Sequence, residues 1–121
     1  MAETSIAVFK NALSETDEVE LTVTGRTSGR ETSRPVWFIH EGDTLYLLPV
    51  KGSESAWFKS ALKSPTIRLA ADDVAISAAA RPITDAQRVR DVVERFRAKY
   101  GADDVKKYYS KFDVAVEVPL R

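Results

Sequence analysis

Residues 18–41 read EVELTVTGRTSGRETSRPVWFIHE, and the pattern of this stretch decides the fold. Its first part, Glu18 to Thr24, alternates apolar and polar side chains, which is typical of a strand with one buried face. Its last part, Thr32 to Glu41, is a second strand pattern with apolar residues on both faces. We therefore expect two strands joined by a turn. Core should cover one side of the second strand, and a ligand, a helix or a second subunit should cover the other.

Similar strand patterns recur further along the chain, and helical patterns separate some of them. Further strands are expected at Thr44 to Val50, Thr66 to Ala71, Val74 to Ile83 and Asp113 to Leu120. Helices are expected at Glu3 to Ser14, Glu54 to Lys63 and Thr84 to Tyr100, with a helical turn within Asp103 to Lys111. Few crossovers favour an α+β, mainly β, fold around an antiparallel sheet or barrel of six strands. We expect one domain over residues 1–121, with a helix in 1–16 and the barrel with its helices in 17–121.

The composition excludes several classes of protein and site. The chain has 121 residues and a formal net charge of zero, which disfavours a general nucleic-acid binder. It has no cysteine and one histidine, so a thiolate nucleophile, a Cys-based zinc site and a His-rich metal site are excluded. No apolar run approaches the ~18 residues of a membrane span, and the start does not read as a signal peptide. We expect a cytoplasmic protein without stable membrane insertion.

The turn from Thr24 to Arg30 is the first candidate binding site. Gly25 and Gly29 allow positive φ and an outward-facing set of N–H groups. Arg26, with Arg34 just beyond the turn, adds fixed positive charge that suits a phosphate or a carboxylate. Gly, Ser and Thr also form ordinary hairpin loops, so the turn alone leaves a purely structural role open.

A second loop offers the same chemistry after the third expected strand. Lys51 next to Gly52 can reach a phosphate across an open backbone, and Ser53 or Ser55 is placed to cap the following helix. The N-terminus of a helix attracts anions. Trp57 in this helix either fills the core or walls a pocket for a flat ring.

No residues form a nucleophile–base–acid constellation. His40 lies beside a turn signal without a serine partner or a second histidine, so it is interpreted as a partly exposed structural residue. Phe58 is interpreted as a core residue. An enzyme built on this chain would need its chemistry from a cofactor.

Several motifs in order resemble a known family. They are Thr-Gly-Arg-Thr-Ser-Gly at 24–29, Pro35, Gly42-Asp43, Lys51-Gly52, Ala-Trp-Phe at 56–58, Leu62 and Ser-Pro at 64–65. The pattern resembles the deazaflavin-dependent nitroreductase family, within the split β-barrel flavin and deazaflavin oxidoreductase superfamily. The resemblance implies a six-stranded split barrel of the FMN-binding type that binds the deazaflavin coenzyme F420. It also implies hydride transfer from the reduced coenzyme to a quinone, an enone or a nitro compound.

The resemblance further implies the residues of the site. The cofactor-binding set is Arg26, Thr27, Ser28, Gly29, Arg34, Pro35, Lys51, Gly52 and Trp57. Tyr108 and Tyr109 fall where family members place tyrosines over the substrate, and such a hydroxyl would steady developing charge on a carbonyl or nitro oxygen. The chain departs from the family at Thr27 and Val50, where lysine and serine are usual.

The alternatives are a split barrel that holds FMN, FAD or heme, a non-catalytic binding protein, and a structural dimer module. A homodimer is compatible with the doubly apolar strand.

Overall fold

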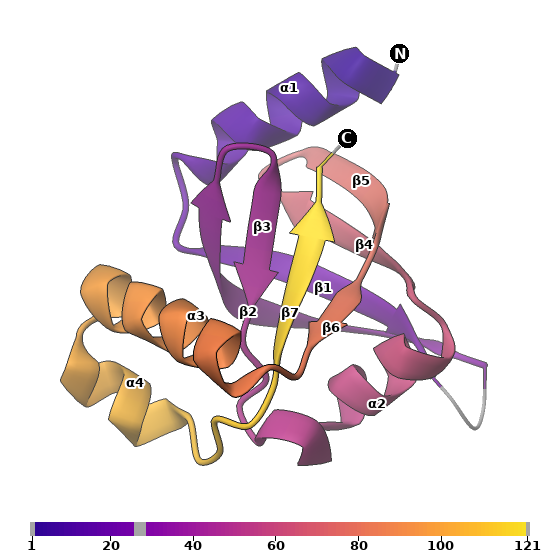
Figure 1. The fold of residues 1–121 in the computed structure, drawn as a ribbon. Helices are drawn as coiled ribbons and strands as arrows, with labels where there is room; N and C mark the ends of the chain where they lie inside the picture. The colour runs from indigo at the N-terminus through magenta and orange to yellow at the C-terminus, as the bar shows by residue number, and fades with distance from the viewer. Residues whose placement is uncertain (1, 26–28, 121) are drawn as a thin grey trace.

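The computed structural model describes residues 2–25 and 29–120, and a curled antiparallel sheet forms its centre (Figure 1). The strands are β1 (Glu18–Thr24), β2 (Glu31–Glu41), β3 (Thr44–Leu47), β4 (Thr66–Ala71), β5 (Val74–Ala79), β6 (Arg81–Ile83) and β7 (Ala115–Pro119). Their order across the sheet is β5-β4-β1-β2-β3-β7-β6. The predicted mainly β, split-barrel fold class is confirmed, with seven strands among the described residues in place of six.

Four α-helices and one 3₁₀-helix surround the sheet in the described part of the chain. They are α1 (Ala2–Leu13), η1 (Gly52–Glu54), α2 (Ala56–Lys63), α3 (Ala86–Tyr100) and α4 (Ala102–Tyr108). Figure 1 shows α1 and α2 at opposite ends of the curled sheet, with α3 and α4 along its outer side. The helices therefore cover the two ends of the sheet and part of its outer side.

Strand β2 belongs to both halves of the sheet. It pairs with β1 from Glu31 to Trp37, and with β3 from Phe38 to Glu41. The change of partner lies between Trp37 and Phe38, where successive side chains point to opposite faces. The sheet therefore divides at this point of β2.

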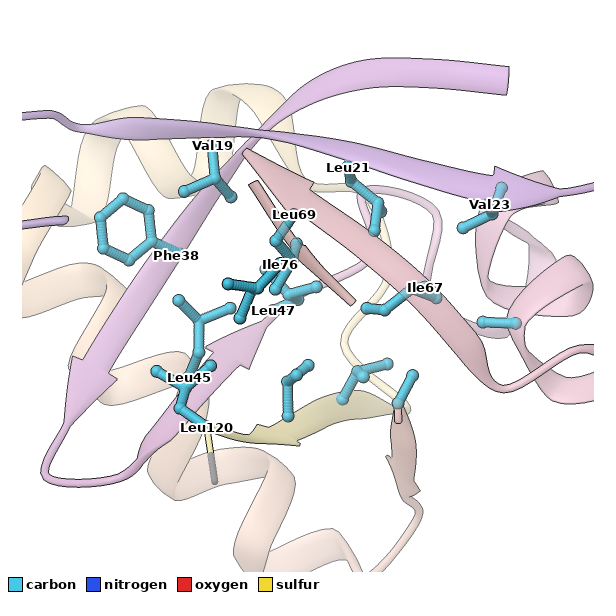
Figure 2. Packing of buried hydrophobic residues seen from close by; sticks show 14 of the residues in the cluster. Val19, Leu21, Val23, Phe38, Leu45, Leu47, Ile67, Leu69, Ile76 and Leu120 are labelled. Atoms are coloured by element: carbon cyan, nitrogen blue, oxygen red, sulfur yellow. The ribbon is translucent and has the colours of Figure 1, made fainter. Parts of the chain in front are cut away.

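The larger core fills the inside of the curled sheet (Figure 2). Alternate residues of the strands point inward there, and Leu21, Leu45 and Leu69 are fully buried. Phe9 of α1 and Phe58 of α2 close the core from its two ends. The core role predicted for Phe58 is confirmed.

A second core lies on the outer side of the sheet, under α3 and α4. The apolar stripe of α3, Val89, Val92, Val93 and Phe96, packs there. Ile39 from β2 and Ile83 from β6 meet this stripe. At Ile39 the second apolar face of β2 is therefore covered by a helix, which is one of the alternatives that the sequence left open.

Several predicted element boundaries are wrong for local reasons. The strand expected at Val74 to Ile83 divides into β5, which pairs with β4, and β6, which pairs with β7. Ala80 lies at this change of partner, where its N–H makes a last bond to the β4 side, to the carbonyl of Pro65 at 2.8 Å. The third strand ends at Leu47, close before Pro49, which has no N–H to donate. The cap of α3 is Asp85, whose carboxylate accepts the N–H of Arg88 at 3.0 Å.

Candidate functional site

A cavity of about 640 Å³ lies where β2, the loop after β3, the start of α2 and the end of α4 meet. Its volume falls within the range of roughly 300–1,000 Å³ that small-molecule sites occupy. Its lining combines cationic side chains, called here the cationic wall, with aromatic rings, called here the aromatic wall. The cavity is therefore suited to a ligand with a flat ring and an anionic part.

The cationic side chains are Arg34 of β2 and Lys51 of the loop after β3. Among the described residues neither has an ion-pair partner, whereas Glu54 at the rim lies 3.7 Å from Lys59. Glu18 also lines the cavity. Two cations that share one cavity in this way form an electrostatic site for a phosphate or a carboxylate.

The loop that carries Lys51 is held by its own backbone. The N–H of Gly52 donates to the carbonyl of Pro49 at 3.0 Å, and the N–H of Lys51 donates to the Ser55 hydroxyl at 2.9 Å. Ser53 donates its N–H and its hydroxyl to the carboxylate of Asp113, at 2.9 and 2.5 Å. The N–H groups of these three residues are occupied, so Lys51 is left to act on a ligand through its side chain.

The start of α2 borders the same cavity through Ser55, Ala56 and Trp57. Ser55 occupies the N-cap position, but its hydroxyl makes no cap hydrogen bond. Neither predicted serine caps this helix, because Ser55 accepts from Lys51 and Ser53 donates to Asp113. The uncapped helix end adds its positive dipole to the cationic wall.

The aromatic wall combines rings that are far apart in the sequence. The indole of Trp37 lies 5.6 Å from the ring of Tyr108 in an edge arrangement and 5.9 Å from the ring of Tyr109, measured between centroids. The C-terminal segment reaches this place because Ser110 donates its N–H to the carbonyl of Val50 at 2.8 Å. Trp57 is only 4% exposed, so it fills the core and also lines the cavity.

Tyr109 lines the cavity as an almost fully buried residue. Its side chain is 6% exposed, and the described residues offer its hydroxyl no hydrogen-bond partner. Every fully buried polar side-chain atom in the described ranges has a partner, so this hydroxyl keeps some exposed surface. Burial, reinforced by the neighbouring Tyr100, raises the pKa of Tyr109 well above 10.0. The phenol therefore stays protonated and can donate at neutral pH.

The structure brings together six of the predicted site residues. These are Arg34, Pro35, Lys51, Trp57, Tyr108 and Tyr109. Gly29 and Gly52 do not line the cavity, and Arg26, Thr27 and Ser28 lie outside the described residues. Positive φ is confirmed at Gly29, and Gly52 also has a positive φ. The prediction of outward-facing N–H groups is wrong for Gly25 and Gly29, because they donate within the turn to the carbonyls of Arg30 and Gly25, at 2.7 and 3.0 Å.

Trp37 lines the cavity although the sequence did not place it in the site, whereas His40 lies outside the cavity. Trp37 lines the cavity but is absent from the predicted site, although the doubly apolar pattern of its strand is a signal that its second face meets another structure. His40 lies outside the cavity, and its Nε2 is 2.9 Å from the carbonyl oxygen of Gly42. The structural interpretation of His40 is confirmed.

Solved structures of other proteins share this fold. An F420-H2 dependent reductase, FDR-A, is 18% identical with a TM-score of 0.65, over 84% of this chain and 93% of that one. The heme storage protein HutZ from Vibrio cholerae is 12% identical with a TM-score of 0.68, over 93% of this chain and 87% of that one. A structure described as a domain-swapped dimer is 16% identical with a TM-score of 0.66, over 96% of this chain and 94% of that one. At these identities the similarity shows the fold alone.

Three further findings concern the sequence and the hydropathy of the helices. No curated protein matches the chain. Within the described ranges, no helix combines the length and the apolar character needed to cross a bilayer. Residues 11–116 match the family described as "Uncharacterized protein conserved in bacteria (DUF2255)", so the chain belongs to the DUF2255 family.

Proposed function

We propose that this protein is an oxidoreductase that uses a ring cofactor, with the deazaflavin F420 as coenzyme and FMN as the alternative. The observation that carries the proposal is the cavity itself, where Arg34 and Lys51, without ion-pair partners in the described part of the chain, share one space with an aromatic wall. Both cofactors combine a planar ring with an anionic tail. The similarity of the fold to an F420-H2 dependent reductase supports the choice.

The residues present fit such a group. Lys51 and Arg34 would hold the phosphate, because both are cationic and lack an ion-pair partner among the described residues. The start of α2 would add its dipole to that interaction. Trp57 and the apolar side chains of Val36 and Leu48 would line the part of the cavity that takes the ring.

When bound, the reduced deazaflavin ring supplies a hydride to an electrophilic acceptor such as a quinone, an enone or a nitro compound. Tyr109 would donate its hydroxyl hydrogen bond to the acceptor oxygen, where negative charge develops. Tyr108, which is 51% exposed at the rim, would cover the acceptor. If both Tyr108→Phe and Tyr109→Phe leave turnover intact, this role for the tyrosines is wrong.

The experiment that tests the proposal is a titration of the purified protein with F420, FMN, FAD and heme, followed by fluorescence or absorbance. Lys51→Ala should weaken binding of F420 or FMN about tenfold, because it removes a charge-assisted contact to phosphate. Lys63→Ala is the matched control, since Lys63 belongs to the far end of α2 and lies outside the cavity. Equal affinity for wild type and Lys51→Ala would contradict the assignment of Lys51.

A non-catalytic binding protein is the second candidate function. The similarity in fold to a heme storage protein favours it, as do the departures from the family pattern at Thr27 and Val50. Substrate-dependent oxidation of bound reduced coenzyme distinguishes the two candidates. Binding without turnover toward quinones, enones and nitro compounds would favour storage or sequestration over reduction.

A further inference from the structure

Trp37 stands at the centre of the aromatic wall. Its indole stacks on the ring of Tyr100 with a centroid distance of 4.2 Å and an interplanar angle of 7°. Rings of Tyr108 and Tyr109 approach it at 5.6 and 5.9 Å. Trp37 is half-buried and lines the cavity, whereas Trp57 is almost fully buried. Of the two tryptophans, Trp37 therefore has the more accessible ring.

Tyr100 is fixed at the point where β2 changes its pairing partner. Its hydroxyl oxygen accepts the N–H of Phe38 at 3.1 Å and lies 3.0 Å from the carbonyl oxygen of the same residue. The hydroxyl also donates to the carbonyl of Asp17 at 2.8 Å. Lys99, the preceding residue, donates to the Phe38 carbonyl at 3.0 Å, and its Nζ lies 3.7 Å from the centroid of the Phe38 ring. The end of α3 is thus bound to the backbone beside Trp37.

These contacts leave Trp37 little freedom. The Tyr100 ring covers one face of the indole, and the hydroxyl of Tyr100 holds that ring against β2. A rigid aromatic side chain loses little entropy when a planar ligand stacks on it or packs against its edge. A half-exposed indole held in this way is preorganised for a ring ligand rather than for burial alone.

We propose that Trp37 is a ring-binding residue of the cavity and that Tyr100 is the positioning residue that presents it. The inference rests on the proposed function, because it concerns the same cavity, but it concerns the ring and not the anionic tail. Riboflavin, which has the isoalloxazine ring of FMN without the phosphate, separates these two parts. Trp37 should contribute equally to riboflavin and FMN binding, whereas Lys51 should contribute to FMN binding alone.

The first measurement is a pair of titrations, with riboflavin and with FMN, on four proteins: wild type, Trp37→Phe, Trp37→Leu and Lys51→Ala. Trp37→Leu should weaken both ligands by the same factor, about tenfold. Trp37→Phe keeps an aromatic ring and should fall between Trp37→Leu and wild type, and it replaces Trp37→Leu if that variant does not fold. Unchanged affinity in both Trp37 variants would overturn the inference and leave the proposed function standing. If the wild type binds neither riboflavin, FMN nor F420, the proposed function and the inference both fail.

The second measurement tests Tyr100 without relying on turnover. In a Trp57→Phe background Trp37 is the one remaining tryptophan, because the sequence has two. Its fluorescence and near-UV circular dichroism then report the stacked pair directly. Tyr100→Phe retains the ring but loses the hydroxyl contacts, so its signal and its riboflavin affinity should fall between those of the Trp57→Phe parent and Tyr100→Leu. Tyr100→Leu should change the signal and weaken riboflavin about as much as Trp37→Leu does. A Tyr100→Leu protein that is folded, has an altered signal and binds riboflavin normally would overturn the positioning role.

Discussion

At Gly52 the backbone has a φ of +55°, and a Cβ added there would lie 2.1 Å from Oδ1 of Asp113. Two requirements thus coincide at one residue: a left-handed backbone and space for a carboxylate. Glycine meets both, because it has no Cβ and adopts positive φ at no steric cost. The glycine of the Lys51-Gly52 pair is therefore explained by the Asp113 contact, without any direct contact to a ligand.

Gly52→Ala should destabilise the protein more than Gly42→Ala. Gly42 has a nearly equal φ of +57°, but a Cβ added there would have nothing within 4 Å. Both substitutions should cost on the order of 1–3 kcal/mol for the strained backbone, and Gly52→Ala should add the cost of displacing Asp113. Urea unfolding of both variants measures the difference. In an Asp113→Ala background the extra cost at Gly52 should disappear, and an equal cost at the two glycines would contradict the contact.

Among the elements, η1 and the segment before β7 are joined by the same carboxylate. The hydrogen bond from the Ser53 hydroxyl is the largest cause that lowers the pKa of Asp113 below its ordinary value of 3.8. Burial is the second-largest effect and raises the pKa, whereas the Ser53 N–H and the positive charge of Lys111 lower it. This contact joins the loop that carries Lys51 to the segment that follows Tyr109, so both sides of the cavity depend on it.

The lowered pKa predicts how this contact responds to acid. Because the pKa of Asp113 is lower in the folded state than in the unfolded state, the carboxylate stabilises the fold above pH 3.8, and this contribution is lost as the pH falls through the folded-state value. Asp113→Asn should therefore flatten the acid limb of unfolding free energy against pH. Asp73→Asn, in the turn between β4 and β5, is the control and should leave the limb unchanged. Parallel acid limbs for wild type and Asp113→Asn would show that the contact does not stabilise the fold.

On the scale of the whole molecule, α1 is an integral part of the core. Phe9 is fully buried against the inside of the sheet, and Lys10 forms an ion pair with Asp43 in the turn between β2 and β3. The helix expected at Glu3 to Ser14 therefore forms and packs against the rest of the fold. Removal of its apolar side would open one end of the barrel core to water.

Phe9→Ala should therefore lower the free energy of unfolding by about 3–5 kcal/mol, as expected for a fully buried phenylalanine. Val8→Ala is the neighbouring control, because Val8 is 44% exposed, and it should change stability by no more than about 0.5 kcal/mol. Chemical denaturation monitored by circular dichroism measures both. A small effect at Phe9 would mean that the barrel folds without α1.

The oligomeric state remains a prediction, and the structure changes the argument for it. The doubly apolar strand no longer favours a homodimer, because α3 and α4 cover its second face through the core that contains Ile39. The fold is similar to that of a structure described as a domain-swapped dimer. Sedimentation equilibrium of the purified protein distinguishes a monomer from a homodimer.

The sequence by itself determined the elements whose pattern is local. Alternation with a period of two predicts β1 with the bounds observed and β2 within one residue, and a repeat of 3.6 predicts the buried stripe of α3. The break at Ala80 and the short β3 escaped prediction. At Ala80 the chain changes its pairing partner from β4 to β7, and β3 ends close before Pro49.

Only the tertiary structure decided which side chains share the cavity. Resemblance of motifs suggested Lys51, Arg34 and the two tyrosines, but it did not suggest Trp37 or Asp113. Trp37 meets Tyr100, and Asp113 meets Ser53, across at least 60 residues of chain. No local period encodes such pairs, because they join residues that are far apart in the sequence and meet only where α3, α4 and the segment before β7 pack against the rest of the fold. The sequence thus determined the strands and the charges, and long-range packing brought the charges and the rings to one cavity.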